Sequence, residues 1–109
     1  MKDLYVLNSQ FDTEKKIVIF GTGQHAKDTY FQLIERGIKP EYFADRKEEL
    51  IGLKLWGIEI ISEESLKGLD CQIIVASTAW REICNRLESN GINQIYVDRN
   101  RYDEEEFEI

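Results

Sequence analysis

The 109-residue sequence is poor in the side chains on which disulfide frameworks and zinc sites depend. It contains two cysteines, Cys71 and Cys84, and a single histidine, His25. Two cysteines are too few for a disulfide framework and lack metal-ligand spacing, and one histidine argues against a zinc site of the Cys/His kind. Cys84 lies beside Ile83 on the apolar side of a predicted helix, so we interpret it as core packing. We expect no metal site.

Long hydrophobic runs are also missing. The apolar run at residues 4–7 is far too short for the core of a signal peptide, and no stretch approaches the length needed to cross a bilayer. We therefore expect a cytoplasmic protein without membrane insertion. The length suffices for one domain and leaves no room for a second core.

Positive charge is scarce, and the formal net charge is −7. Residues 98–109 hold six acidic side chains against two arginines, so the rest of the chain is only mildly acidic. No basic stripe is present to neutralise a phosphate backbone, which disfavours binding of DNA or RNA. We interpret residues 99–109 as an acidic tail or linker. Residues 1–14 show no convincing period, and we interpret them as an N-terminal extension.

The sequence does contain two copies of one strand–helix–strand plan, over residues 16–46 and 72–99. Each copy has an apolar strand, a turn of small residues, a helix that ends in Gly-Ile, and a short strand closed by Asp-Arg. Apolar residues at helical spacing predict the two helices, and the glycines that follow them are expected to form left-handed caps. The helices are predicted over residues 24–36 and 79–90. Strands are predicted over residues 17–20, 42–44, 58–61, 72–76 and 95–97.

These segments predict an α/β domain over residues 15–98 with a three-layer Rossmann-like fold. Parallel neighbours require crossover helices, and right-handed crossovers place helices on both faces of a sheet. We expect a five-stranded parallel sheet in the spatial order 3-2-1-4-5. Residues 46–57 are polar and irregular, and Ser62 with Ser65 predicts a short capped helix through Lys67.

The turn between the first strand and the first helix, GTGQHA, fits the pattern G-x-G-x-x-G/A. Gly21 allows a tight turn, Gly23 lets the backbone approach a ligand, and Ala26 lets the helix lie close to the sheet. The first N–H groups of a helix lack intrahelical acceptors, so an anionic phosphate suits the space above the turn. The candidate ligand contacts in this turn are Gly21, Thr22, Gly23, Gln24 and His25.

An acid at the end of the second strand supports a nucleotide site. Asp45 lies 24 residues after Gly21, near the position where dinucleotide folds use an acid to bind a ribose. The alternative is a strand-ending aspartate that meets water. Asp45 suits an unphosphorylated ribose, although the adjacent Arg46 leaves NADP open. Asp98, the counterpart in the second unit, is interpreted as structural.

The expected strand order places the topological switch between the first and fourth strands, where ligands of open α/β sheets bind. Ser77 and Thr78 border this crevice. Their hydroxyls are suited to a phosphate or a sugar, or alternatively to capping the next helix, and capping is the favoured interpretation for Thr78. Arg81, in the first turn of that helix, opposes the helix dipole unless an anion is near, so it is a candidate phosphate partner.

No catalytic set emerges from the sequence. His25 lies at the positive end of a helix, which favours its neutral form. We interpret it as a turn or ligand contact rather than a base, because no second catalytic group accompanies it. No Ser/His/Asp set is evident. Trp56 is interpreted as a partly buried strap over the sheet edge, with base stacking as the alternative.

The segments KIVIFGTGQHAKDTYFQLIERG, EYFADR, LWGIEII and IIVAST resemble the N-terminal domain of bacterial sugar O- and N-acyltransferases of the sialic acid and bacillosamine pathways. The resemblance implies a Rossmann-like domain that binds a UDP-sugar or another sugar nucleotide, with contacts at Gly21, Gly23, His25 and Asp45. In that family a hexapeptide-repeat β-helix carries the acetyl-CoA site and the catalytic histidine. This sequence has no such repeat, and Gln24 replaces the usual small residue of the turn, so we do not expect acyl transfer by this chain alone.

Three functions are compatible with the sequence. The first is a nucleotide-sugar-binding module, UDP-sugar-like in its ligand, that belongs to a sugar acyltransferase, a nucleotide-sugar epimerase or dehydrogenase, or stands alone. The second is an NAD(H)-binding redox or sensor domain. The third is an interaction domain whose ligand site has decayed. We expect a small-molecule nucleotide as partner, and fusion to another domain or homo-oligomerisation is compatible with each function.

Overall fold

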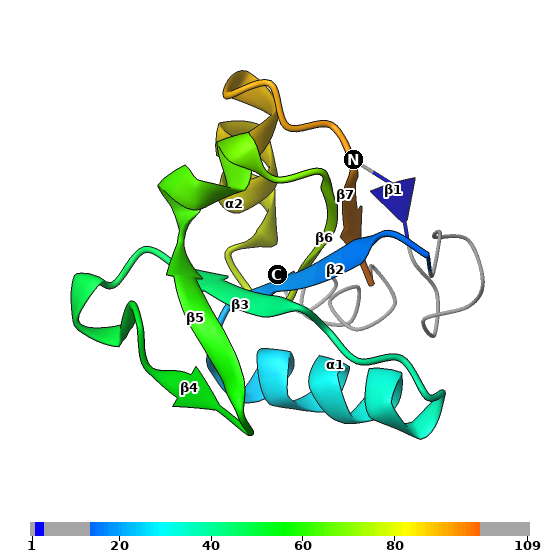
Figure 1. The fold of residues 1–109 in the computed structure, drawn as a ribbon. Coiled ribbons are helices and arrows are strands. Elements are labelled where there is room, and N and C mark those ends of the chain that lie inside the picture. Colours follow the sequence, from blue (N-terminus) through cyan, green and yellow to red (C-terminus); the bar gives the residue numbers. More distant parts are fainter. Residues whose placement is uncertain (1, 4–13, 99–109) are drawn as a thin grey trace.

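A computed structural model describes residues 2–3 and 14–98, in which a β-sheet lies between two α-helices (Figure 1). The strands follow the spatial order β1-β7-β6-β2-β3-β5-β4. Five of them are the predicted strands, in the predicted order 3-2-1-4-5 and all parallel to one another, so the Rossmann-like class is confirmed. These five are β2 (Lys16–Phe20), β3 (Tyr42–Asp45), β5 (Ile58–Ser62), β6 (Cys71–Val75) and β7 (Ile95–Val97).

Two short strands extend the sheet beyond the predicted five. β1 (Lys2–Asp3) pairs in parallel with β7, and β4 (Lys54–Leu55) pairs antiparallel with β5. The expectation of five strands, all parallel, is therefore wrong in the strand number and in the direction of one strand. Both additions have two residues, which is too short for a period-2 pattern to show in the sequence.

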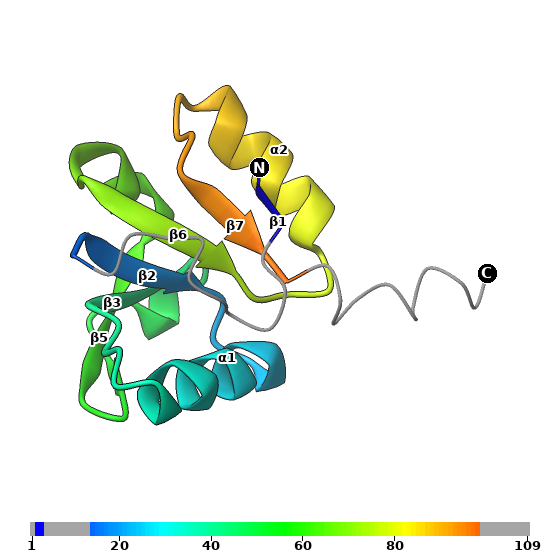
Figure 2. The same ribbon diagram turned by 90° about the vertical axis from the view of Figure 1, so that its right-hand side faces the viewer.

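The central strand β2 is apolar on both faces because a helix covers each face. Ile17 and Ile19 point into the core cluster that includes Tyr30 and Leu33 of α1 (Gln24–Glu35). Val18 points the other way, into the cluster formed with α2 (Trp80–Ser89). Successive side chains of a strand alternate between faces, so a strand covered twice reads as a continuous apolar run. Figure 2 shows α1 and α2 on opposite sides of the sheet.

The helices end as predicted, in left-handed glycines. Gly37 has φ 75° and Gly91 has φ 83°. Ile38 donates its backbone N–H to the carbonyl of Leu33 (2.9 Å), and Ile92 makes the equivalent bond at the end of α2. These bonds satisfy carbonyls that the helix leaves without partners. No helix in the described part of the chain is long and apolar enough to cross a membrane.

Two 3₁₀ turns complete the described elements, η1 (Glu48–Leu50) and η2 (Glu63–Gly68). The second is the short capped helix predicted after the third core strand. The hydroxyl of Ser62 accepts a hydrogen bond from the backbone N–H of Ser65 (3.2 Å), which is the expected cap.

The strand order opens a crevice at one end of the sheet. From β2 the chain crosses through α1 to β3, and from β6 it crosses through α2 to β7. Because β2 and β6 are neighbours, their following loops diverge at the carboxyl ends of these strands, as Figure 2 shows. The predicted topological switch is therefore present between β2 and β6.

Both cysteines are buried and unbridged. Burial raises the pKa of the Cys84 thiol to about 11, and it also raises the pKa of Cys71 above its usual value. The nearby carboxylates of Glu88 and Asp70 act in the same direction. The thiolate is the reactive form of cysteine, so both thiols should be inert in the folded protein.

We expect neither thiol to react with DTNB under native conditions at about pH 8, where only a small fraction is thiolate. Addition of guanidinium chloride should release the colour of both thiols, because unfolding removes the burial. A Cys84→Ala variant should give half of that amplitude. Rapid native reaction of either thiol would contradict the described packing.

Candidate functional site

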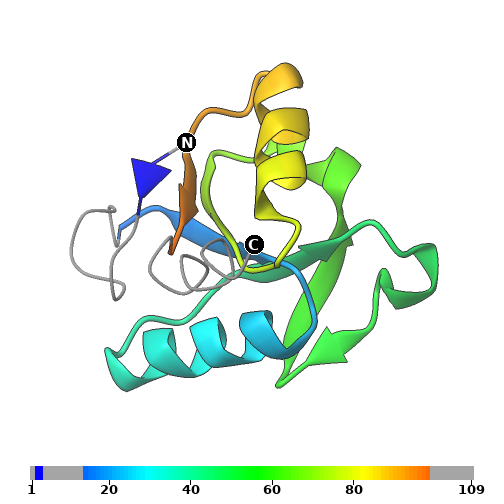
Figure 3. The same cartoon turned by 180° about the vertical axis from the view of Figure 1, so that it is seen from behind.

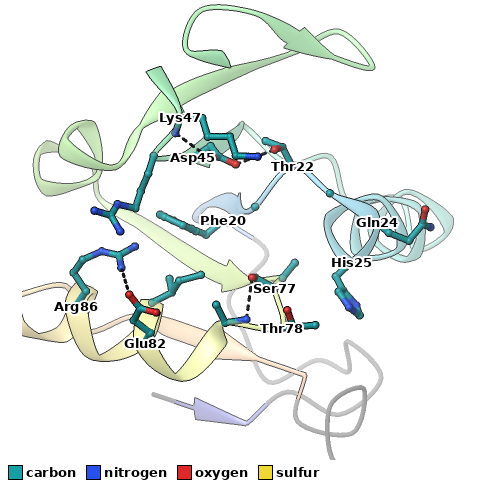
Figure 4. A pocket seen from close by; sticks show the side chains of 16 residues that line it. Phe20, Thr22, Gln24, His25, Asp45, Lys47, Ser77, Thr78, Glu82 and Arg86 are labelled. Atoms are coloured by element: carbon teal, nitrogen blue, oxygen red, sulfur yellow. Dashed lines mark hydrogen bonds and ion pairs between the residues drawn. The ribbon is translucent and has the colours of Figure 1, made fainter. Parts of the chain in front are cut away.

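A cleft of about 460 Å³ opens at the carboxyl ends of β2, β3 and β6 (Figure 4). Its walls come from the β2–α1 turn, the residues that follow β3, the loop after β6 and the first turns of α2. Nine of the ten predicted site residues line it, and Arg81 is the exception. The fold thus brings together residues that are up to 57 positions apart, from Gly21 to Thr78.

Gly21 is held between the two strands that flank β2. Its N–H donates to the carbonyl of Ala44 in β3 (2.9 Å), and the N–H of Ala76, directly after β6, donates to the carbonyl of Phe20 (2.9 Å). Gly21 has φ 124°, and a Cβ on it would lie 2.6 Å from the carbonyl oxygen of Ala76. Only glycine fits this position, because both its backbone conformation and its surroundings exclude a side chain.

Gly23 has a different role from Gly21. It precedes α1 with φ −91° and ψ −155°, a conformation that any residue adopts, and a Cβ placed on it meets no atom within 4 Å. Gly23 also supplies no side-chain cap to α1. The fold therefore does not require a glycine at this position. The missing side chain instead leaves space above the first helical N–H groups, through which a ligand in the cleft could approach them.

The carboxylate of Asp45 is held in a fixed orientation by its neighbours. Thr22 donates its hydroxyl to Oδ2 (2.8 Å), and the backbone N–H of Lys47 donates to Oδ1 (3.0 Å). Each carboxylate oxygen has a second lone pair, so Asp45 retains acceptor capacity toward the cleft. The structure thus joins two predicted site residues, Thr22 of the turn and Asp45 of β3, in one hydrogen-bonded unit.

The remaining turn residues differ in where their side chains lie. Gln24 donates its amide to the carboxylate of Asp28 along the helix (2.9 Å), so its side chain follows the helix surface. His25 is half-buried at the start of α1 and lines the cleft, as does Arg46 beside Asp45. Among residues 2–3 and 14–98, no group of three or more metal-ligating side chains is gathered at one point.

On the α2 side, the hydroxyl that organises the loop is that of Ser77. It accepts a hydrogen bond from the N–H of Ala79 (3.1 Å), whereas Thr78, the residue favoured for capping, is exposed at the cleft. Arg81 is placed elsewhere. Its guanidinium lies 4.9 Å from the centre of the Trp80 ring, outside the lining of the cleft.

Sequence reasoning missed the far wall of the cleft, where Glu82 and Arg86 lie one helical turn apart on α2 (Figure 4). Arg86 donates two parallel hydrogen bonds to Glu63 of η2, from Nε to Oε2 and from Nη2 to Oε1, both 2.8 Å. These bonds raise the pKa of Arg86. Its Nη1 lies 3.8 Å from Glu82. The sequence signal for this wall is the pair Glu82 and Arg86, two charged residues four positions apart that flank Ile83 on α2 and line the cleft.

A family model described as C2185-like, N-terminal, matches residues 13–97, which is most of the chain. The chain belongs to this family. The resemblance to the sugar acyltransferases stays a prediction. No curated protein sequence matches the chain.

Several solved structures share the fold of this C2185-like domain, and two of them are described here. One is the UDP-D-quinovosamine 4-dehydrogenase from Vibrio fischeri, with 19% identity, a TM-score of 0.54, and coverage of 76% of this chain and 75% of that chain. The other is RSP, a Rex-family repressor, with 22% identity, a TM-score of 0.54, and coverage of 78% of this chain. The match spans 46% of the repressor, so the domain corresponds to about half of that protein. At these identities the likeness shows a Rossmann-type fold.

Alanine substitutions at the two glycines of the turn should affect the stability of the fold to different extents. Gly21→Ala forces a Cβ against the Ala76 carbonyl at a positive φ, and we expect it to lower the free energy of unfolding by about 2–4 kcal/mol. Gly23→Ala meets no atom and should change stability by less than about 0.5 kcal/mol. Urea unfolding followed by circular dichroism measures both, and equal losses would contradict the described turn.

The Arg86–Glu63 pair should stabilise the far wall. Its two partners are only 23% and 18% exposed, and the contact is bidentate. We expect a double-mutant cycle with Arg86→Met and Glu63→Gln to give a coupling free energy of about 1–2 kcal/mol. The exposed pair Lys67–Glu64 serves as the control and should couple by less than about 0.5 kcal/mol. Equal coupling in the two cycles would show that Arg86 is not held as described.

Proposed function

We propose that this domain binds a nucleotide whose phosphates lie over the turn from Gly21 to Gly23. The observation that carries the proposal is a helix start with no side-chain cap, open to the cleft through a glycine that the backbone does not need. The positive end of the α1 dipole and its first N–H groups suit the negative charge of a diphosphate. Ser77, across the β2–β6 crevice, borders the same space.

The ribose of the nucleotide fits beside Asp45. Thr22 and the backbone of Lys47 hold this carboxylate at the edge of the cleft, with lone pairs left for two vicinal hydroxyls. A carboxylate in a fixed orientation is a better acceptor for a diol than a mobile one, because less side-chain entropy is lost on binding. Asp45 therefore supports a ribose that carries no 2′-phosphate, which a negative side chain would repel.

The base fits between the β3 side of the cleft and α2. Phe20 and Ile83 give this part of the lining an apolar surface, and Glu82 and Arg86 offer an acceptor and donors at its edge. The volume of about 460 Å³ lies within the range that small-molecule sites occupy, roughly 300–1,000 Å³. A nucleotide therefore matches the cleft in size, polarity and the position of its charge.

A nucleotide sugar, UDP-sugar-like in character, is the ligand class we propose. The resemblance of the GTGQHAK turn to the sugar acyltransferases supports it, and so does the shared fold with an enzyme named for a UDP-sugar. In this role the domain holds the substrate, and a further part of a sugar-modifying system performs the reaction. Polysaccharide biosynthesis is the setting that this role suits.

NAD(H) is the second candidate, and Asp45 is the observation that favours it. Dinucleotide-binding domains place an acid at the end of the second strand to bind the adenosine ribose, and Asp45 ends β3, which corresponds to that strand. The shared fold with a Rex-family repressor is compatible with this alternative. A redox-sensing role would need only the binding site and no catalytic residue in this chain.

Titration calorimetry with UDP, a UDP-N-acetylhexosamine and NADH separates these ligands. We expect saturable binding of the UDP compounds with a Kd below about 1 mM. NADH fluorescence enhancement with no response to UDP would favour the second candidate instead. Absence of any response at millimolar concentrations of each would overturn nucleotide binding and leave the interaction-domain alternative.

Variants of cleft residues test whether the ligand binds in the cleft. Gly23→Val fills the space above the first helical N–H groups, so we expect binding to be lost while the melting temperature stays unchanged. Asp45→Asn should weaken binding by about tenfold, because a charge-assisted acceptor is replaced by a neutral one. The matched control is Gly68→Val in η2, where a Cβ also meets no atom but the residue lies outside the cleft. Unchanged binding in Gly23→Val would contradict the proposed phosphate position.

A further inference from the structure

A second feature of the molecule lies away from the cleft, where an aromatic cluster joins α1 to the β4–β5 hairpin. The indole of Trp56 stacks on Tyr30 with ring centres 4.8 Å apart and an interplanar angle of 14°. It also meets the edge of Phe31 at 5.5 Å. Tyr30 is buried, but Trp56 is 44% exposed and Phe31 is 43% exposed. The cluster is thus half core and half surface.

Trp56 occupies a backbone position that disfavours it. It has φ 48° and Gly57 has φ 80°, in the two-residue loop that connects the paired residues Leu55 and Ile58. Two positive φ values define the hairpin turn for which Asn-Gly is preferred. A bulky aromatic side chain in this region carries strain, and such strain persists where the side chain has a use. Stacking on Tyr30 offsets part of the strain, yet nearly half of the indole faces outward.

Two more large apolar side chains extend this surface. Ile34, 40% exposed, lies one helical turn beyond Tyr30 and Phe31 on α1. Leu53, 54% exposed, comes two residues before Leu55, which packs on the α1 side of the core. Figure 3 shows the hairpin beside α1. We call this surface, made of Phe31, Ile34, Leu53 and Trp56, the α1 patch.

Charged residues frame the α1 patch in a symmetric way. Lys27 lies four residues before Phe31 and Glu35 lies four residues after it, so the three form one ridge along the helix. Both charged side chains are exposed, and neither forms an ion pair within the part of the chain that the structure describes. The ridge therefore presents a positive end, an aromatic centre and a negative end.

We propose that the α1 patch is the interface of a two-fold symmetric dimer of this chain, in which α1 packs antiparallel against α1 of a second copy. A two-fold axis through Phe31 brings Lys27 of one copy opposite Glu35 of the other, twice in each dimer. In an isologous interface the same surface must complement itself, and this ridge does so only in the antiparallel direction. Contiguous exposed apolar surface with a polar rim is typical of such contacts.

The dimer leaves the nucleotide cleft open. No residue of the α1 patch lines the cleft, which lies at the carboxyl ends of the strands, whereas the patch covers the outer face of α1 and the hairpin. The proposal consequently does not depend on the proposed ligand, and dimerisation and nucleotide binding are measured separately.

Sedimentation equilibrium of the full chain tests the association. We expect a dimer with a dissociation constant on the order of 10–100 μM, as suits a contact at the small end of specific interfaces. Added salt should weaken it, because the framing ion pairs are exposed to solvent. A chain that stays monomeric at about 1 mM would overturn the proposal. That result would also be the outcome if this surface binds a different protein or another domain instead of a second copy.

Charge exchange tests the geometry. Lys27→Glu places like charges opposite each other, and so does Glu35→Lys, so each single variant should weaken the dimer at least about tenfold. The double variant Lys27→Glu/Glu35→Lys restores opposite charges in an antiparallel pair, and its dimer should return to within about threefold of the original. Failure of this rescue would overturn the antiparallel arrangement.

The control is Asn85→Lys on the exposed side of α2, which packs on the opposite face of the sheet. It should leave the dissociation constant unchanged, and an equal weakening there would overturn the assignment of the interface to α1. Circular dichroism melts of all variants show whether each one is folded. Because none of these positions contributes to the buried core, we expect all variants to melt within a few degrees of the original chain.

Discussion

The close approach of Gly21 to the carbonyl of Ala76 is the constraint on which the rest of the site depends. Because this residue has no side chain, the backbone leaving β2 passes directly between the ends of β3 and β6, with hydrogen bonds to both. That passage determines where α1 begins and therefore which N–H groups face the crevice. Asp45 and Ser77 are brought to the same opening because Asp45 ends β3 and Ser77 follows β6, and the turn is bonded at the ends of these two strands.

The elements that the sequence made predictable are those whose signals are local. Gly37 and Gly91 ended the helices where expected, and the uninterrupted apolar strands implied a helix on each face of the sheet. The strand order followed from connection rules that leave few alternatives for two strand–helix–strand units. Most of the candidate site then followed, since the crevice position is a consequence of that order.

What could not be predicted depends on contacts between segments distant in sequence. β1 and β4 are strands only because a neighbouring strand offers hydrogen bonds, and two residues carry no pattern of their own. Arg86 enters the cleft wall through its bond to Glu63, a pairing across 23 positions that spacing does not reveal. Arg81 was expected at the crevice from its place in the first turn of α2, but its guanidinium lies over the Trp80 ring and outside the cleft lining.

The two short outer strands also affect how the molecule meets others of its kind. A sheet that ends in a long, flat strand offers a row of unpaired backbone groups to any passing chain, and such borders promote runaway fibre growth. Here β1 covers β7 and β4 covers β5, and each border strand has only two residues. With so little backbone available at either margin of the described sheet, the dimer that we propose is formed by side chains on the flank of the domain, where a two-fold contact closes after one partner instead of propagating.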